Sequence, residues 1–341
     1  MRVGIVGTGA VAWKHADAYK NIGYTIRACT NTNAERGRKF AAATGAEFFD
    51  TVEELCQHPE IDIVDVCTFP SYRLEAVELC AKNNKHLLVQ KPMAVDLETA
   101  RKMIVLARDA GIQLGVVSQH RFDDSFLFLK KAITNGRLGR ILQADAYVKW
   151  WRSAEYYARP IKGSWAVEGG GALISQAIHQ VDLLLYLIGP VDEVFGYWKL
   201  GGVHPIESED LLSAVLHYSS GALGVIQAAT SLWPGYPERI EIHGTKGSAI
   251  VTGDQLTTWD VQDDAGEPAP VGSQAASGAS IPMAISVVPF ERQLSDFGEA
   301  CKANRPPACS GLDGFRALQL VRGIYTSCSE GRKVDITTPN F

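Results

Sequence analysis

Short apolar runs alternate with amphipathic segments along the first third of the chain. The run 61–67 is largely apolar, as expected of a strand that is buried on both faces of a sheet. The predicted strands cover residues 2–6, 25–30, 47–49, 61–67, 86–89 and 113–117. The predicted helices between them cover residues 11–21, 34–44, 52–56, 72–83 and 97–110. Strand–helix alternation with short connections predicts a doubly wound parallel sheet in a first domain, residues 1–119, that ends near Gln119.

After a helix predicted at residues 124–135, the pattern of the chain changes. Strand-like segments follow one another, and several are joined by short turns that contain glycine, such as 219–221 and 244–247. The predicted strands cover residues 141–150, 191–199, 211–218, 222–231, 239–243 and 248–251. Helices are predicted at residues 171–188, 291–303 and 312–330. This pattern predicts a second α/β domain, residues 120–341, with a large, open and predominantly antiparallel sheet.

Two further expectations concern the second domain. The segment 262–282 is rich in Ala, Gly, Ser and Pro, which predicts a long mobile loop. Helices on one side of the large sheet leave its other face in need of cover, and a second subunit is the usual solution. We therefore expect a homodimer or a homotetramer.

The composition narrows the class of protein. The 341 residues suffice for two domains, and 46% hydrophobic with 21% charged residues exclude disordered, collagen-like and coiled-coil chains. A net charge of −5 predicts no basic surface for binding nucleic acid.

The distribution of polar residues and cysteines bears on the compartment. The apolar helix 172–188 is interrupted by His179 and Asp182 among other polar residues, so no membrane span is predicted. The N-terminus lacks a signal-peptide pattern because Gly7 and Gly9 interrupt its apolar run. Seven cysteines without a C-x-x-C pair fit a reducing compartment. We expect a soluble cytoplasmic protein.

A glycine-rich turn, Gly7-Thr8-Gly9-Ala10-Val11-Ala12, follows the first predicted strand and opens the first predicted helix. Gly7 allows a tight turn, Gly9 lets a pyrophosphate approach the backbone, and the small Ala12 permits close packing of the helix on the strand. Free N–H groups and the helix dipole favour an anion at this helix N-terminus. In this context the motif predicts a dinucleotide-binding Rossmann domain, whereas alone it would indicate only a tight turn. The expected cofactor contacts here are Gly7, Thr8, Gly9, Ala10 and Val11.

The end of the second predicted strand bears on the choice between NAD and NADP. An acidic residue there would accept a hydrogen bond from the ribose 2′-OH of NAD and repel a 2′-phosphate. The sequence instead has Asn31 and Thr32, with Arg36 close behind. Neutral donors backed by cations favour NADP, and NAD stays the alternative because the cations would equally form a solvated helix face. Further cofactor contacts are expected from Thr68, Pro70, Gln90 and Lys91.

Lys91 follows the strand predicted at residues 86–89. Ligands of open α/β sheets bind at the carboxyl ends of the strands, so the ammonium group of Lys91 is expected to point into the cofactor crevice. There it could hold a substrate hydroxyl and stabilise alkoxide character as hydride leaves. The alternative is a surface lysine in a loop.

A second candidate lies in the helix that follows Gly169-Gly170-Gly171. Ser175, His179 and Asp182 are spaced i, i+4, i+7, which places them on one helical face. His179 could act there as a general base toward a substrate hydroxyl, while Asp182 orients or supports the structure. The alternative is a hydrogen-bonded core histidine. No third residue has convincing metal-ligand spacing, so no metal site is predicted.

These motifs give the chain a resemblance to the Gfo/Idh/MocA family, the group of glucose–fructose oxidoreductase and inositol dehydrogenase. The resemblance covers essentially the whole chain and includes residues 240–247, Ile-Glu-Ile-His-Gly-Thr-Lys-Gly. It implies a Rossmann domain followed by an α/β domain with a large open sheet, often in dimers or tetramers. It also implies oxidation or reduction of a ring hydroxyl or carbonyl of a sugar or cyclitol by NAD(H) or NADP(H), with Lys91 and His179 as the catalytic pair.

Two positions depart from the family pattern. Gln90 stands where the family usually has the glutamate of Glu-Lys-Pro, so hydrogen bonds are kept but the charge that holds Lys91 in its cationic state is lost. Ser175 stands where many sugar dehydrogenases of the family carry an aspartate, four residues before the histidine. Serine can bind a substrate hydroxyl but cannot be an anionic base. The second departure argues against an inositol dehydrogenase and leaves hydride transfer intact.

Aromatic and arginine side chains cluster between the first strand of the second domain and the helix of His179. Aromatic faces pack well on the C–H faces of pyranose rings, and arginines suit carboxylate or phosphate groups. A packed aromatic cluster or a subunit contact is the alternative for each of them. The expected substrate contacts are Lys91, His120, Arg121, Arg152, Tyr156, Trp165, Ser175, Gln176 and His179.

Together these observations predict an NAD(P)-dependent oxidoreductase of carbohydrate metabolism that acts on a secondary hydroxyl or carbonyl of a sugar or sugar derivative. Two alternatives stay open: redox-assisted glycoside cleavage with a recycled cofactor, and a non-catalytic NAD(P) sensor. Retention of Lys91 and His179 argues against the sensor.

Overall fold

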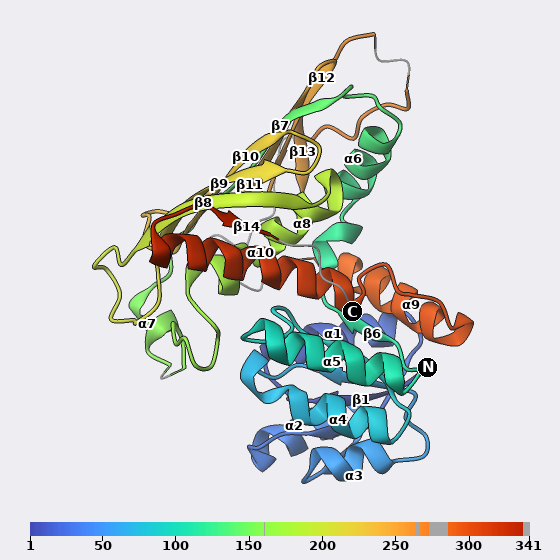
Figure 1. Ribbon diagram of the computed structural model, residues 1–341. Helices are drawn as coiled ribbons and strands as arrows, with labels where there is room; N and C mark the ends of the chain where they lie inside the picture. Colours follow the sequence, from blue (N-terminus) through green and yellow to red (C-terminus); the bar gives the residue numbers. More distant parts are fainter. Residues whose placement is uncertain (160, 264–265, 273–285, 337–341) are drawn as a thin grey trace. The chain divides into compact units, whose positions relative to one another are not determined.

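The chain divides into two compact units. The computed structural model describes residues 1–159, 161–263, 266–272 and 286–336. The first unit contains Met1–Gln119 and Ser286–Phe315, and the second contains His120–Ile285 and Arg316–Asn340. Each unit is built around one β-sheet (Figure 1).

The sheet of the first unit has six strands in the order β3-β2-β1-β4-β5-β6. The strands are β1 (Arg2–Val6), β2 (Thr25–Thr30), β3 (Glu47–Phe49), β4 (Ile63–Val66), β5 (His86–Val89) and β6 (Leu114–Val116). Neighbouring strands are parallel throughout, which confirms the predicted doubly wound sheet. The strand order reverses between β1 and β4, the place where sheets of this kind bind ligands.

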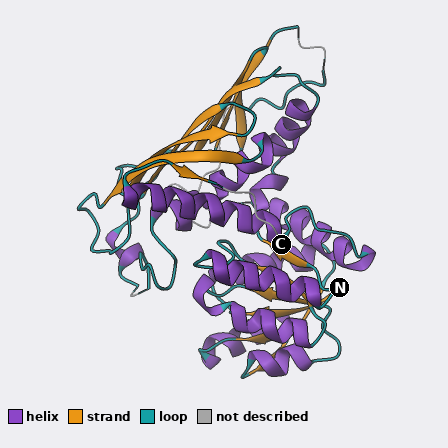
Figure 2. Ribbon diagram, viewed as in Figure 1, coloured by secondary structure: helices purple, strands orange, loops and turns teal. Residues whose placement is uncertain are grey.

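Helices connect these strands (Figure 2). They are α1 (Ala10–Asn21), α2 (Ala34–Thr44), α3 (Val52–Gln57), α4 (Leu74–Lys82) and α5 (Leu97–Asp109). A further helix from late in the chain, α9 (Val288–Ala303), belongs to the same unit. Side-chain caps fix three of the starts: Asn33 accepts from the N–H of Arg36, and Thr51 and Asp96 act likewise for α3 and α5. Such caps satisfy N–H groups that have no partner within the helix.

The contacts group residues 286–315 with the first unit, whereas the sequence pattern places them with residues 120–341. Gln293 of α9 accepts a hydrogen bond from the N–H of Ser118 at 3.1 Å and donates to the carbonyl of Val116 at 2.9 Å. Gly298 packs so closely on Tyr24 that a Cβ atom there would lie 2.1 Å from the tyrosine oxygen. The helix therefore completes the core of the first unit from the far end of the sequence.

The second unit contains an eight-stranded sheet in the order β13-β12-β11-β7-β10-β9-β8-β14. Its strands are β7 (Ile141–Lys149), β8 (Val191–Lys199), β9 (Leu211–Tyr218), β10 (Leu223–Ala229), β11 (Arg239–Gly244), β12 (Gly247–Thr252), β13 (Gln255–Val261) and β14 (Val334–Asp335). Only β7 and β10 pair in parallel, so the predicted predominantly antiparallel sheet is confirmed. The prediction missed β13 and β14.

One face of this sheet is covered and the other is open. In β9, Leu212, Ala214 and Leu216 are buried, whereas the residues between them are exposed. Helix α8 (Ile178–Ile188) packs on β7. The remaining helices are α6 (Asp124–Thr134), α7 (Ala154–Tyr157) and α10 (Gly311–Glu330).

The helix predicted at residues 171–188 is corrected at its start. Its first turn, η3 (Leu173–Ala177), is π-helical, and regular α-helix follows only from Ile178. π-Helical turns are rare and often mark functional sites. A purely periodic sequence pattern predicts helix here without distinguishing the two forms.

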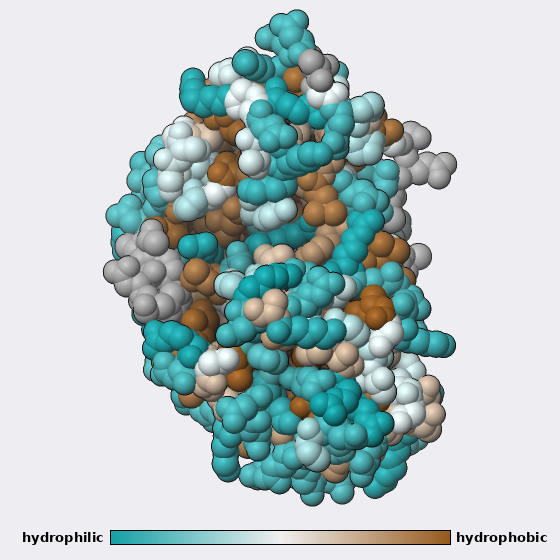
Figure 3. Space-filling model, turned by 90° about the vertical axis from the view of Figure 1, so that its right-hand side faces the viewer, coloured by the Kyte–Doolittle hydropathy of each residue, from teal (hydrophilic) through white to brown (hydrophobic). Residues whose placement is uncertain are grey.

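Two other expectations concern the loop predicted at residues 262–282 and the absence of a membrane-spanning helix. Residues 264–265 and 273–285, within or next to the loop predicted at 262–282, lie outside the described residues. Among the helices that are described, none has both the length and the apolar character needed to cross a membrane. On the face drawn in Figure 3, apolar patches are interspersed with hydrophilic residues.

Candidate active site

The glycine-rich turn between β1 and α1 forms an open cradle. Gly7 has a φ of +88°, and a side chain there would be strained and would meet Thr68 at 3.0 Å. A Cβ atom on Gly9 would meet nothing within 4 Å, so space is open above this residue. Gly9 begins α1 without a capping side chain, while Ala12 is fully buried. The cradle therefore fits the pyrophosphate of a dinucleotide at a helix N-terminus.

The end of β2 is tied to this cradle by Asn31. Its amide donates to the hydroxyl of Thr8 at 2.6 Å, and its oxygen accepts from the N–H of Asn33 at 2.8 Å. Thr32 and Arg36 are exposed beside it. No carboxylate stands between Thr30 and Ala34, so nothing in this segment repels a 2′-phosphate.

A buried arginine, Arg73, holds the loops that follow β4 and β5. Its guanidinium donates to the carbonyl of Thr68 from Nε at 3.0 Å and from Nη2 at 2.5 Å. Its Nη1 donates to the carbonyls of Gln90 and Pro92, on either side of Lys91. Burial lowers the pKa of Arg73 to about 9, which keeps it cationic at neutral pH. Arg73 thus fixes the backbone that carries Lys91, which is itself half-buried.

The side chain of Gln90 ends a buried hydrogen-bond chain. Its amide nitrogen lies 2.9 Å from His15 Nε2, and His15 Nδ1 lies 2.6 Å from Asp65 Oδ2. Tyr19 donates to the same carboxylate oxygen at 2.9 Å. His15 therefore links the Gln90 side chain to the Asp65 carboxylate in one buried chain of hydrogen bonds.

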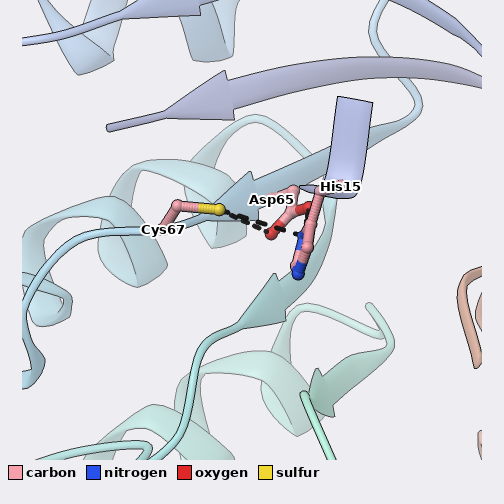
Figure 4. A group of neighbouring side chains, drawn as sticks. All are labelled: His15, Asp65 and Cys67. Atoms are coloured by element: carbon pink, nitrogen blue, oxygen red, sulfur yellow. Dashed lines mark hydrogen bonds and ion pairs between the residues drawn. The ribbon is translucent and has the colours of Figure 1, made fainter. Parts of the chain in front are cut away.

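His15, Asp65 and Cys67 bring three ligand atoms within 4.8 Å of one another (Figure 4). The His15–Asp65 separation of 2.6 Å is a hydrogen bond, and the thiol of Cys67 donates to the other Asp65 oxygen at 3.6 Å. Burial and the neighbouring Asp65 raise the pKa of Cys67 well above its usual range, which disfavours the thiolate that binds metals. We interpret the group as a hydrogen-bonded network that supports Gln90.

In the second unit, His179 lies beside His120. Their rings meet edge to face with centroids 5.0 Å apart, and both residues are half-buried. His120 Nδ1 lies 2.7 Å from Asp123 Oδ2, and this carboxylate is buried. A carboxylate on one ring nitrogen fixes the orientation of an imidazole. Two of the predicted substrate residues, His120 and His179, therefore come together.

Asp182 and Arg121 form a separate buried pair. The guanidinium donates from Nε to Oδ2 at 2.8 Å and from Nη2 to Oδ1 at 2.6 Å. Arg121 also stacks on Tyr186 at 4.9 Å. Both partners are nearly inaccessible, with exposed side-chain fractions of 6% and 5%. This two-pronged ion pair gives both residues a structural role, which is one of the two roles expected of Asp182.

Three more of the predicted substrate residues meet at η3. Arg152 donates to the Gln176 oxygen at 2.8 Å, and the Gln176 amide donates to the Tyr156 hydroxyl at 2.8 Å. Arg152 stacks on Trp150 and Tyr156, and burial lowers its pKa. Gln176 thus joins an arginine to a phenol next to the histidine-bearing helix.

The remaining two candidates have local partners. Ser175 is half-buried and donates to the carbonyl of Gly171 at 2.7 Å, one turn earlier. Trp165 packs on Tyr325 at 5.1 Å and on Trp198 at 6.1 Å, which matches the packed aromatic cluster named as its alternative.

Sequence patterns missed Arg73, His15 and Asp65, because their partners are distant in the chain and form no spaced motif. They also missed Glu209, which lies in the loop just before β9. Its carboxylate is fully buried and binds the glycine segment that precedes η3. The sequence shows only a short acidic segment before the strand predicted at residues 211–218, and this segment has no fixed spacing from the glycines.

Comparison with known proteins gives consistent results over the whole chain. Residues 1–118 match the family described as "Oxidoreductase family, NAD-binding Rossmann fold", and residues 126–250 match "GFO/IDH/MocA C-terminal domain". A myo-inositol 2-dehydrogenase of Thermotoga maritima is 30% identical over 98% of both chains. A 1,5-anhydro-D-fructose reductase of Ensifer adhaerens is 27% identical over 99% of both. The WlbA dehydrogenase of Bordetella pertussis, solved with NADH and UDP-GlcNAcA, superimposes with a TM-score of 0.88 at 28% identity over 99% of both chains.

Proposed function

Because the chain belongs to the GFO/IDH/MocA family of NAD-binding oxidoreductases, we propose that it transfers hydride between a nicotinamide dinucleotide and a secondary hydroxyl or carbonyl of a sugar or sugar derivative. The observation that carries the proposal is the open cradle at Gly9, together with the fixed loop of Lys91 at the carboxyl edge of the same sheet. The activities for which two relatives are named, myo-inositol 2-dehydrogenase and 1,5-anhydro-D-fructose reductase, support the substrate class.

When bound, the cofactor supplies or accepts the hydride at its nicotinamide ring. The residues of the first unit hold it: the α1 N-terminus and the turn Gly7–Val11 bind the pyrophosphate, and Asn31, Thr32 and Arg36 face the adenosine ribose. Thr68, Pro70 and Gln90 complete the edge of the sheet. Lys91 supplies the cationic hydrogen-bond donor that stabilises developing alkoxide character.

In the second unit, His179 exchanges the proton of the substrate hydroxyl. The carboxylate of Asp123 orients His120, whose ring supports that of His179 edge-on. Arg152, Tyr156 and Gln176 form the polar wall for the rest of the sugar, with Ser175 available for one hydroxyl. Trp165 and Arg121 are held by structural partners, so we propose that they contribute less to substrate binding than the other residues do.

The cofactor preference is the finer part of the proposal, and we propose NADP. Asn31 is neutral, Arg36 is exposed, and no carboxylate precedes Glu35 in this segment. Asn31→Asp is expected to shift the ratio of kcat/KM for NADP to that for NAD by about tenfold or more toward NAD, because a carboxylate repels the 2′-phosphate. A wild-type preference for NAD would contradict this part alone.

We also propose that a second copy of the chain covers the open face of the large sheet, giving a homodimer or homotetramer. Tyr197, Val215 and Leu223 are 67%, 52% and 54% exposed. Strand register places Tyr197 and Leu223 opposite Ser213 and His217, on the same face as Val215. Light scattering after gel filtration tests this assignment, and Val215→Asp should lower the mass. A monomeric wild type would overturn it.

The central test is the change in absorbance at about 340 nm with NADP⁺ and NAD⁺ offered separately against a panel of pyranoses, glycosides and inositols. Lys91→Ala and His179→Ala should each lower kcat by about two orders of magnitude or more. Lys82→Ala, on an exposed lysine at the end of α4, is the control. Glycoside turnover without net reduction would favour the recycled-cofactor alternative. Cofactor binding without any turnover in either direction would overturn the proposed activity and favour the sensor.

A further inference from the structure

We propose that Glu209 is a positioning residue: its buried carboxylate sets the start of the helix that presents Gln176 and His179. The proposal rests on the proposed function, because His179 and Gln176 matter only if this face of the helix meets the substrate. Glu209 is not a catalytic residue. It acts through the backbone of residues 171–173.

Three successive N–H groups at the helix start converge on Glu209. Gly171 donates to carboxylate oxygen Oε2 at 2.8 Å, and Leu173 donates to Oε1 at 2.8 Å. The N–H of Ala172 donates to the backbone carbonyl of Glu209 at 2.8 Å. Glu209 is 0% exposed. The first N–H groups of a helix have no partner within the helix, so these donors are satisfied by one residue from another part of the chain.

Helix α10 completes the arrangement from the other side. The hydroxyl of Tyr325 donates to Glu209 Oε1 at 2.8 Å, and Arg322 donates to the carbonyl of Gly169 at 3.0 Å. The glycine segment therefore lies between the end of the loop before β9 and one face of α10, with polar contacts to both.

Two of the three glycines, Gly170 and Gly171, are required by this close approach. A Cβ atom on Gly171 would lie 1.8 Å from the carbonyl oxygen of Glu209. Gly170 has a φ of +148°, and a Cβ atom there would lie 2.4 Å from the Tyr325 hydroxyl. The glycine motif thus serves here as a contact surface for Glu209 and Tyr325, which explains a sequence feature that the proposed chemistry leaves unexplained.

The contacts bear on the site because η3 begins within them. Leu173 is both a donor to Glu209 and the first residue of the π-helical turn, and Gln176 lies in that turn. His179 follows in the next turn, at the start of α8. Any rotation of the helix start would move Gln176 away from Arg152 and Tyr156, and His179 relative to His120. Small misplacements of this kind lower rate strongly when the reacting groups must align.

A glutamine at this position is a sharp probe of the carboxylate. Glutamine has nearly the same shape, but only one of its two terminal atoms accepts hydrogen bonds. In Glu209→Gln one of the two N–H groups, of Gly171 or Leu173, would face an NH₂ group instead. Tyr325→Phe removes one donor to the carboxylate and one long hydrogen bond, 3.4 Å, from the N–H of Ile174. It leaves both backbone contacts of the Glu209 carboxylate in place, so its effect should be smaller.

The experiment compares wild type with Glu209→Gln, Tyr325→Phe and the surface control Glu193→Gln, which only loses an exposed ion pair with Lys333. Steady-state kinetics and amide hydrogen exchange of residues 169–177 are measured on each full-length protein. Glu209→Gln should lower kcat about 10- to 100-fold, leave KM for the cofactor within about twofold and speed exchange in 169–177 only. Tyr325→Phe should lower kcat and speed this exchange to a lesser degree. Glu193→Gln should change neither kcat nor exchange.

Unchanged exchange in residues 169–177 of Glu209→Gln would overturn the proposal, and so would faster exchange with unchanged kcat. If Glu209→Gln does not fold, the same two readouts on Tyr325→Phe decide. Failure of the proposed function has a different signature. Wild type would then turn over no sugar while the exchange difference persists, which separates the two claims.

Discussion

The loops that carry Lys91 and the segment that starts the helix of His179 are each held by one buried charged side chain, but the two charges have opposite sign. Arg73 donates to the carbonyls of Thr68, Gln90 and Pro92. Glu209 instead accepts from two N–H groups at a helix start. Loops that leave parallel strands present carbonyl groups without ladder partners, whereas helix starts present free N–H groups. We call Arg73 the cationic anchor and Glu209 the anionic anchor. Free carbonyl groups require a positively charged donor, and free N–H groups require a negatively charged acceptor, so the backbone groups that must be satisfied determine the sign of the charge.

The two anchors also differ in their response to pH. Burial lowers the pKa of Arg73 to about 9 and raises that of Glu209 to about 7. At neutral pH the arginine stays charged, whereas the glutamate is close to its midpoint. Only the anchor of the second unit is therefore expected to titrate in the neutral range.

Removal of the cationic anchor should have the largest effect. Arg73→Met leaves three carbonyls without their donor. Each unsatisfied buried acceptor costs about 1–3 kcal/mol, and the loss of a buried charge offsets part of this cost. We therefore expect the free energy of unfolding to fall by about 3 kcal/mol. Urea unfolding and cofactor titration measure stability and binding, and cofactor affinity should fall with the loss of the Lys91 loop. Arg108→Met, on an exposed arginine of α5, is the matched control and should change stability by less than about 0.5 kcal/mol. Equal stability of the two variants would show that Arg73 is no anchor.

The anionic anchor should show itself in the pH dependence of stability. The pKa of Glu209 is raised from its ordinary value of 4.5 to about 7, first because burial disfavours its charged form. The folded state thus holds the proton more tightly than the unfolded state. Its contribution to the free energy of unfolding falls as pH rises from about 4.5 to about 7 and is constant above. At about 1.4 kcal/mol per pKa unit, the change is on the order of 3 kcal/mol.

Urea unfolding at pH 5 and pH 8 tests this expectation. Glu209→Gln should lack this part of the pH dependence, so wild type should lose about 3 kcal/mol more than the variant between the two values. The other groups that face Glu209 are Tyr325 and Cys328, and burial raises the pKa of both, so neither titrates in this range. Glu193→Gln should follow wild type. A wild-type-to-variant difference that stays constant with pH would contradict the raised pKa.

Local patterns predicted the regular elements well, because the signals for them are local. The bounds predicted for β2 and α2 coincide with the structure, since Asn33 caps the helix start and Gly45 ends it in the left-handed conformation. The glycine cradle was predicted for the same reason. β13 was missed because its residues, Gln-Leu-Thr-Thr-Trp-Asp-Val, are mostly polar and gain their ladder from β12.

The anchors could not be predicted from spacing. Arg73 and Pro92 are 19 residues apart, and Glu209 and Tyr325 are 116 apart, so only the folded chain brings them together. The i, i+4, i+7 spacing places Asp182 and His179 on one helical face, but it could not show that the Asp182 carboxylate pairs with Arg121 from 61 residues away. A helical period identifies neighbours on one helix, but the strongest partner of a buried charge is chosen by tertiary packing.

The last comparison is between Gly171 and Gly9, two glycines that each precede a helix in the sequence. The smallest change in stability is expected for Gly9. Gly171→Ala forces a Cβ atom to 1.8 Å from the carbonyl oxygen of Glu209, and the backbone must shift, so we expect a loss of about 2 kcal/mol or more. Gly9→Ala meets no atom within 4 Å and has a φ of −75°, so its stability should change by less than about 0.5 kcal/mol. The space above Gly9 is instead the space that a pyrophosphate needs, so cofactor affinity should fall about tenfold or more in Gly9→Ala. Thermal unfolding with and without the cofactor measures both effects. A Gly9→Ala protein that binds the cofactor as tightly as wild type would show that the pyrophosphate does not lie against this turn.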